Sequence, residues 1–112
     1  MAVDRSSAIE REILRPLWKI HILQHAGEGP IIGNWMLEEL REHGFQVSPG
    51  TLYPMLARLT RLGWLRQERA HPGLRTKKAV HYRLTPDGKA ALTEVRARLS
   101  ELQQEVFAKK SS

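Results

Sequence analysis

The chain has 112 residues, no cysteine and a formal net charge of +6. Its length fits a single domain, and the lack of cysteine excludes disulfides and cysteine-based zinc or redox sites, as is common in a reducing cytoplasm. No stretch approaches the roughly 20 apolar residues that cross a bilayer, and the N-terminus lacks a signal-peptide pattern. We therefore expect a cytoplasmic protein without a membrane partner.

The first half of the chain predicts two helices, over about residues 5–26 and 32–43. In the first, apolar side chains recur at helical spacing, and Pro16 should either kink the helix or mark its start. The segment 27–30, which contains two glycines and a proline, should end it. In the second, apolar residues recur every four positions, and Gly44 is a suitable C-terminal cap.

A third helix should begin after Ser48. Serine is a strong N-cap because its hydroxyl accepts an N–H of the first helical turn, and Pro49 follows at a position where proline is favoured. Pro54 is unusual, since it removes one hydrogen bond from the helix interior. Gly63 should end the helix. The predicted buried face comprises Leu52, Met55, Leu56, Leu59 and Leu62.

A hairpin and a last helix complete the predicted elements. Residues 64–69 and 80–84 have the composition of strands, with a polar, basic tip between them. Thr85 and Pro86 repeat the pattern of a cap followed by proline, which predicts a helix over about residues 86–108. Its apolar residues, spaced by 3, 4, 3 and 4, form a two-heptad seam that favours packing on a partner helix. They are Leu92, Val95, Leu99, Leu102 and Val106.

The positive charge is concentrated in one segment. Residues 58–89 hold nine basic and two acidic side chains, so 9 − 2 = +7 lies there and the remainder of the chain sums to −1. A concentrated positive field attracts polyanions, of which DNA is the commonest, although charge alone fits a solvated basic surface equally well. The basic residues are Arg58, Arg61, Arg66, Arg69, Arg75, Lys77, Lys78, Arg83 and Lys89.

This order of elements predicts an α+β, mainly helical fold: a winged helix-turn-helix with an additional C-terminal dimerisation helix. We expect one domain over residues 1–112, in which about residues 5–84 form the N-terminal helix and the winged helix. The third helix would enter the major groove of double-stranded DNA, where arginine reaches phosphates and guanine edges, and the wing would contact phosphates. The predicted DNA-binding residues are Ser48, Gly50, Thr51, Tyr53, Pro54, Arg58, Arg61, Arg75, Lys77 and Lys78.

Three motifs make the chain resemble the PadR family of bacterial transcriptional regulators. The first is Gly29-Pro30-Ile31-Ile32-Gly33, which is similar to the family's opening of the second helix. The second and most specific is Ser48-Pro49-Gly50-Thr51-Leu52-Tyr53-Pro54. The third is Tyr82-Arg83-Leu84-Thr85-Pro86-Asp87-Gly88, at the end of the wing. Together they cover about residues 9–90.

The resemblance implies a homodimer built by the N-terminal and C-terminal helices, and repression through near-palindromic promoter DNA. It also allows a small aromatic or cationic effector, for which Trp18 is the candidate contact. The short last helix is similar to the compact branch of the family, but it lacks the tryptophans with which some compact members bind flat drugs. The residues expected at the dimer interface are Ile13, Leu17, Trp18, Leu92, Val95, Leu99, Leu102 and Val106.

Other functions have less support. His21 and His25 have the i, i+4 spacing of a helical metal site, but no cysteine is available and Glu28 should lie beyond the helix, so we expect no metal site. No phosphate loop, metalloprotease motif or nucleophile elbow is present, and we expect neither an enzyme nor a cofactor. Three alternatives stay open: a winged-helix adaptor that binds an acidic protein, an RNA-binding winged helix and a broad xenobiotic sensor.

Overall fold

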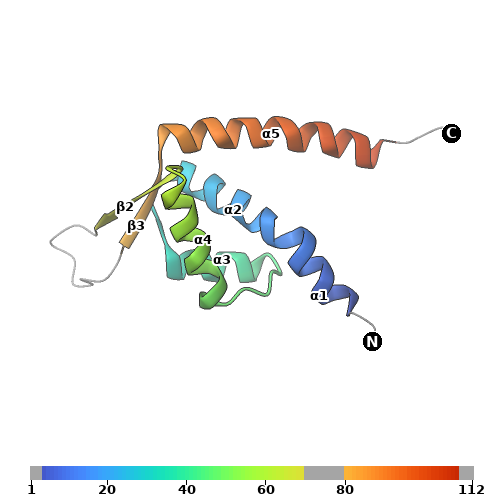
Figure 1. Ribbon diagram of the computed structural model, residues 1–112, viewed down its shortest axis with the longest axis horizontal. Helices are drawn as coiled ribbons and strands as arrows, with labels where there is room; N and C mark the ends of the chain where they lie inside the picture. The colour runs from blue at the N-terminus through green and yellow to red at the C-terminus, as the bar shows by residue number, and fades with distance from the viewer. Residues whose placement is uncertain (1–3, 70–79, 109–112) are drawn as a thin grey trace.

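The computed structural model describes residues 4–69 and 80–108, and it begins with one long helical rod. The rod consists of α1 (Arg5–Ile9), a π-helical turn η1 (Glu10–Leu14) and α2 (Arg15–Glu28) (Figure 1). In the π-helical turn the N–H of Arg15 donates to the carbonyl of Glu10, five residues back. Helix α2 begins at Arg15, directly before Pro16, as predicted. It extends to Glu28, two residues beyond the predicted end.

Two further helices form a helix-turn-helix. They are α3 (Gly33–Glu42) and α4 (Pro49–Arg61), close to the predicted ranges. Each is followed by a glycine with positive φ, 90° at Gly44 and 83° at Gly63, a conformation that other residues seldom adopt. The residue after each glycine donates its backbone N–H to the last turn of the helix, at 3.1 and 3.0 Å. These bonds satisfy helix-end carbonyls and fix the direction of the chain that follows.

A three-stranded antiparallel sheet has the order β1-β3-β2. The hairpin strands β2 (Leu65–Arg69) and β3 (Val80–Leu84) match the predicted runs, and Leu65 pairs with Leu84. Strand β1 (Ile31–Ile32) was not predicted. It pairs with the other edge of β3, where Ile31 faces Tyr82. Because a two-residue strand has no periodicity of its own, only its pairing identifies it.

The core lies where α2, α3, α4 and the hairpin meet. On the hairpin the alternation of a strand buries Tyr82 and exposes Arg83. The predicted buried face of α4 is correct for most of its length, but Leu62 follows the end of the helix and its side chain is 47% exposed. The fully buried side chains are Trp18, Ile22, Met36, Leu40, Leu52, Leu56, Leu59 and Leu65.

Helix α5 (Pro86–Phe107) begins at Thr85, whose hydroxyl accepts the N–H of Gly88 at 2.9 Å. Its first half packs on α2 through the buried Leu92, and Arg96 donates a hydrogen bond to Gln24. Beyond this contact α5 and the α1–α2 rod diverge, so the second half of α5 lies away from the core (Figure 1). In the described ranges, no helix combines the length and the apolar character that crossing a bilayer requires.

Candidate nucleic-acid interface

Helix α4 has one buried and one exposed face. Three leucines anchor it in the core, and the opposite face exposes Gly50, Pro54, Arg58 and Arg61. Thr51 is half-buried between the two faces. This division matches the predicted helical wheel. It leaves small residues near the N-terminus of α4 and two arginines, one turn apart, near its C-terminus.

The N-terminus of α4 differs from the prediction in one hydrogen bond. The hydroxyl of Ser48 does not cap an N–H of the first turn; it lies 3.3 Å from the hydroxyl of Thr51. The carbonyl of Ser48 accepts the N–H groups of Thr51 and Leu52, each at 3.0 Å. The extended backbone of Ser48 places it as the N-cap, as predicted, and both hydroxyls remain at the surface beside the helix end. Polar groups at a helix N-terminus are well placed to meet a phosphate.

Tyr53 packs its ring against the start of α3. A Cβ atom built on Gly33 would lie 2.6 Å from Cε1 of Tyr53 and 2.9 Å from its hydroxyl oxygen. The Tyr53 side chain is nevertheless 43% exposed. Tyr53, one of the predicted DNA-binding residues, therefore also packs α4 against α3.

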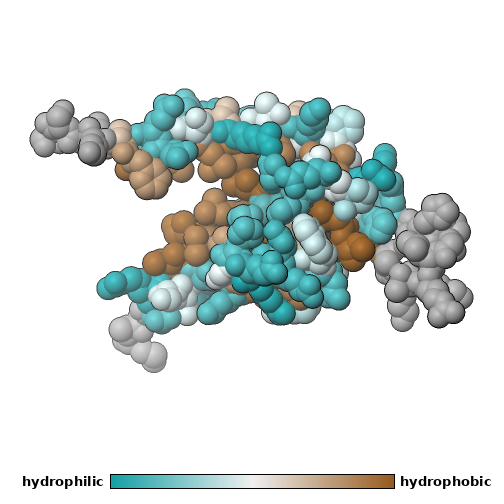
Figure 2. All heavy atoms as spheres, turned by 180° about the vertical axis from the view of Figure 1, so that it is seen from behind, coloured by the Kyte–Doolittle hydropathy of each residue, from teal (hydrophilic) through white to brown (hydrophobic). Residues whose placement is uncertain are grey.

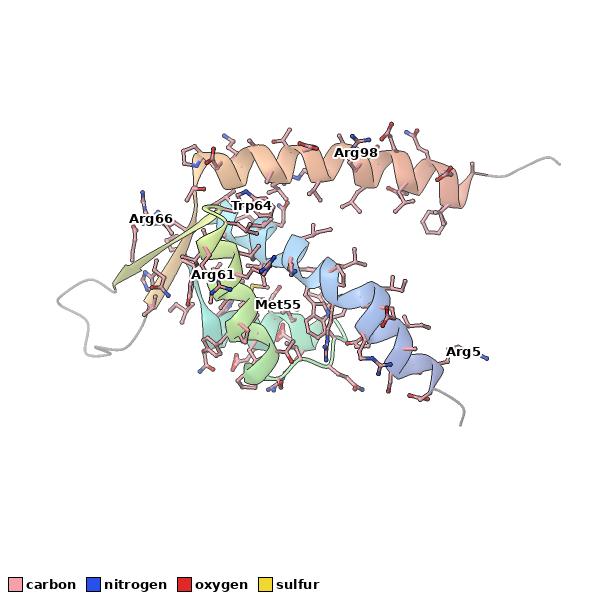
Figure 3. The ribbon with its side chains drawn as sticks, viewed as in Figure 1. Arg5, Met55, Arg61, Trp64, Arg66 and Arg98 are labelled. Carbon is pink, nitrogen blue, oxygen red and sulfur yellow. The ribbon has the colours of Figure 1, made fainter. Side chains whose placement is uncertain are left out.

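The hairpin carries an arginine pair that the sequence-based list of DNA-binding residues omitted. Arg66 and Arg83 are cross-strand partners on β2 and β3, and both side chains are at least half exposed. Glu68 lies between them, with its carboxylate 3.6 Å from Nη2 of Arg66 and 2.5 Å from Nε of Arg83. Figure 3 shows Arg66 extending from the hairpin and Arg61 on α4. The charge count in the sequence contained both arginines, but only their cross-strand register pairs them.

The three basic residues predicted at the tip of the wing lie outside the described residues. They are Arg75, Lys77 and Lys78. In the described ranges the basic surface includes Arg58 and Arg61 on α4, Arg66 and Arg83 on the hairpin, and Lys89 on α5.

The residues predicted at the dimer interface fall into two groups. Ile13 is 57% exposed on the rod, and Leu102 and Val106 are 52% and 61% exposed on α5. Leu17, Val95 and Leu99 are half-buried. Seen from the back, apolar surface lines both sides of the opening between the rod and α5 (Figure 2).

The second group, Trp18 and Leu92, does not lie at this surface. Trp18 has no exposed area, and its ring meets the edge of Phe45 with centroids 5.9 Å apart. Leu92 is 4% exposed in the contact between α5 and the core. The prediction placed both residues on faces directed to a partner, whereas the fold directs them inward. For Trp18 the same burial contradicts the assignment as an effector contact, because a side chain without exposed area offers no surface to a ligand.

Together these elements define a class of protein. A helix-turn-helix, an antiparallel hairpin and a short strand that pairs with the outer edge of that hairpin make up a winged helix-turn-helix. Exposed arginines lie on its second helix and on its wing.

The chain belongs to the Transcriptional regulator PadR-like family, whose sequence model matches residues 22–94. Members of this family are transcriptional regulators and not enzymes. The chain is 46% identical over 97 residues to the transcriptional regulator Rv3488 of Mycobacterium tuberculosis, a match that covers 87% of this chain and 89% of the relative.

Solved structures agree with this assignment. A PadR family transcriptional regulator from Eggerthella lenta superposes with a TM-score of 0.76 at 31% identity, over 90% of this chain and 88% of that one. FabT of Streptococcus pneumoniae, in complex with DNA, superposes with a TM-score of 0.58 at 20% identity, over 83% of this chain and 61% of that one. At this identity the likeness to FabT is one of fold alone.

Proposed function

We propose that the chain is a homodimeric repressor that binds a near-palindromic operator in double-stranded DNA. Its α4 enters the major groove, and its wing contacts the flanking phosphates. The observation that carries the proposal is the division of α4, whose leucines fix one face in the core while Arg58 and Arg61 are exposed on the other. The helix is thereby held rigidly by its fold and presents cationic side chains outward.

The charges fit contact with a polyanion. Arg58 and Arg61 lie three residues apart and so share one face of α4. Arginine binds guanine edges through two hydrogen bonds and binds phosphates through its charge. On the wing, Glu68 balances part of the charge of Arg66 and Arg83. We therefore assign base contacts to α4 and backbone contacts to the wing.

A second copy of the chain supplies the symmetry that a near-palindrome needs. The apolar seam on α5 and the exposed Ile13 of the rod are the surfaces that would meet the partner. Apolar side chains this exposed favour burial against another apolar surface. Leu102, Val106 and Phe107 are each more than half exposed.

An effector, if bound, would act at this same seam. The tryptophan there is Trp64, which is half-buried and lines a shallow apolar pocket on α5 with Val95, Leu99 and Leu102. A ligand that fits only one arrangement of the two subunits would change the distance between the recognition helices. Quenching of tryptophan fluorescence by flat aromatic cations, lost in Trp64→Phe, would identify such a site.

The experiment that tests the main proposal is selection of bound duplexes from a random DNA pool at about 150 mM salt. Enrichment of an inverted repeat supports a site-specific dimer and gives the operator motif. Binding without enrichment that disappears as salt rises contradicts it, because non-specific affinity comes from the release of phosphate counterions. That second result would favour an adaptor whose basic surface binds an acidic protein. Preference for structured RNA over duplex DNA at equal salt would instead favour the RNA-binding alternative.

A further inference from the structure

Three histidines from two helices meet beside the helix-turn-helix. His21 and His25 lie one turn apart on α2, and His43 directly follows α3. Each offers one ring nitrogen, and these three atoms all lie within 4.8 Å of one another. The sequence predicted only the first two as neighbours. The packing of α3 on α2 adds the third.

The separations between the three nitrogens are close to those between the nitrogen ligands of a bound zinc ion. Nitrogen ligands at about 2.0–2.1 Å from a tetrahedral zinc stand about 3.4 Å apart. Side-chain rotations that close the separations by at most about 1.4 Å would therefore complete the coordination. All three rings retain some exposure to solvent, so an ion can reach them.

A carboxylate lies beside two of the three histidines. The Oε1 atom of Glu39 is 3.6 Å from Nε2 of His25 and 3.4 Å from Nε2 of His43. Its side chain is 22% exposed. Three imidazoles and one carboxylate form a set of nitrogen and oxygen ligands that suits Zn²⁺.

The ring nitrogen of His25 that points away from the cluster, Nδ1, has a carboxylate neighbour, as is common for a metal-ligating histidine. A carboxylate oxygen of Glu28 lies 3.2 Å from Nδ1 of His25. A proton on Nδ1 can be donated to Glu28, which leaves the lone pair of Nε2 directed toward Glu39 and the cluster. A carboxylate bonded to the far nitrogen of a ligating histidine orients the ring and raises its basicity. Because α2 reaches Glu28, this residue is an orienting partner of His25 and does not lie outside the helix as expected.

Aromatic neighbours hold two of the rings. His21 meets the edge of Phe45 with centroids 5.3 Å apart, and His25 meets the edge of Trp35 at 5.2 Å. These edge contacts orient the two rings beside the cluster.

We propose that His21, His25 and His43, with Glu39 as the fourth ligand, form a binding site for Zn²⁺. The site joins α2 to the end of α3, at the turn that leads into α4. Across that turn, Nε of Arg41 on α3 donates a hydrogen bond of 3.0 Å to the carbonyl of Val47. Binding of the ion does not depend on the proposed DNA function, since its ligands lie on α2, on α3 and at the residue after α3, and none lies on α4 or the wing.

The test uses the full chain without an affinity tag. We expect calorimetric titration with Zn²⁺ to give one ion per chain, and Co²⁺ in its place to give the strong visible absorption of a four-coordinate site. His43→Ala and Glu39→Gln, which each remove a ligand, should weaken binding by more than the roughly 10–100-fold that loss of an outer-shell partner costs. His81→Ala is the matched control, since His81 is a histidine of β3 outside the cluster.

Several results would overturn the proposal. They are an absence of Zn²⁺ binding to the wild type, equal affinity in His43→Ala, and an equal loss of affinity in His81→Ala. Because the His43 side chain is half exposed, its truncation should leave the fold intact. A circular dichroism spectrum and melting curve of each apo variant check this directly. His43→Gln, which retains a polar side chain, should reproduce the loss of binding if the loss comes from the missing ligand.

Discussion

The ring of Tyr53 lies over the backbone of Gly33, so closely that a Cβ atom on Gly33 would stand 2.6 Å from the ring. Gly33 is buried at the first position of α3, and Tyr53 lies in the first half of α4. The contact sets how closely the two helices of the helix-turn-helix approach one another. It therefore also sets the position of the face of α4 that we assign to DNA.

We predict that Gly33→Ala displaces the half-exposed ring of Tyr53 and lowers the free energy of unfolding by an amount at the low end of the roughly 1–3 kcal/mol that overpacked sites cost, because the ring can turn toward solvent. Chemical denaturation measures the loss. In a Tyr53→Ala background the same substitution should cost much less, because the ring that it meets is absent. Gly29→Ala is the control, since nothing lies within 4 Å of a Cβ at Gly29. Additive costs in the double variant would show that the contact does not limit the helix packing.

We predict that Arg58→Ala weakens operator binding and leaves the dimer intact. A base contact should cost about 1–3 kcal/mol and relax specificity at one position, whereas a phosphate contact should lower the salt slope by about one. Fluorescence anisotropy at several salt concentrations separates the two. Arg98→Ala removes an equally charged, 76% exposed arginine from α5 and serves as the control. Unchanged affinity in Arg58→Ala would remove this residue from the interface.

We predict that Leu102→Glu breaks the dimer, because it places a charge in the apolar seam of α5. The side chain is 52% exposed in the single chain, so the fold of the monomer should survive. Ala97→Glu adds the same charge on the opposite, exposed side of α5 and should leave the dimer intact. Sedimentation velocity reports the oligomeric state. A Leu102→Glu variant that sediments as a dimer would contradict the use of this helix as the dimer contact.

We predict that Trp18→Ala costs about 3–5 kcal/mol of unfolding free energy, as expected for a large aromatic truncated in a core. Trp18→Phe should cost clearly less. Among the described residues the buried indole N–H of Trp18 has no hydrogen-bond partner, and phenylalanine removes this unsatisfied donor. Thermal and denaturant unfolding measure both variants. Equal losses in the two variants would contradict the prediction, because the volume that phenylalanine fills would then restore no stability.

We predict that Zn²⁺ raises the stability of the wild-type chain. At a free concentration about 100 times its Kd, a ligand that binds only the folded state adds about 2.7 kcal/mol of unfolding free energy. Denaturant unfolding with and without Zn²⁺ measures the increment. It should vanish in His43→Ala and persist in His81→Ala. An equal increment in both variants would place the ion elsewhere on the chain.

Local signals in the sequence predicted most of the elements well. The range of α4 followed from a serine and proline at one end, a glycine at the other, and apolar periodicity between them, whereas both hairpin strands followed from their composition. Such signals act within a few residues and require no knowledge of the remaining fold. The family motifs likewise lie in contiguous segments. Strand β1 was missed because its two residues gain their structure only by pairing with β3.

The sequence by itself thus determined the winged helix-turn-helix, its basic surface and the family. Tertiary structure decided which faces of these elements are buried and which are exposed to solvent. It buried Trp18 against Phe45, paired Arg66 with Arg83, and set Tyr53 on Gly33. It also brought His43 to two histidines of α2, from which β1 and α3 separate it along the chain. These relationships depend on how two helices or strands approach and cross. That geometry is set by packing in the core, and the periodicity of a single segment gives no information about it.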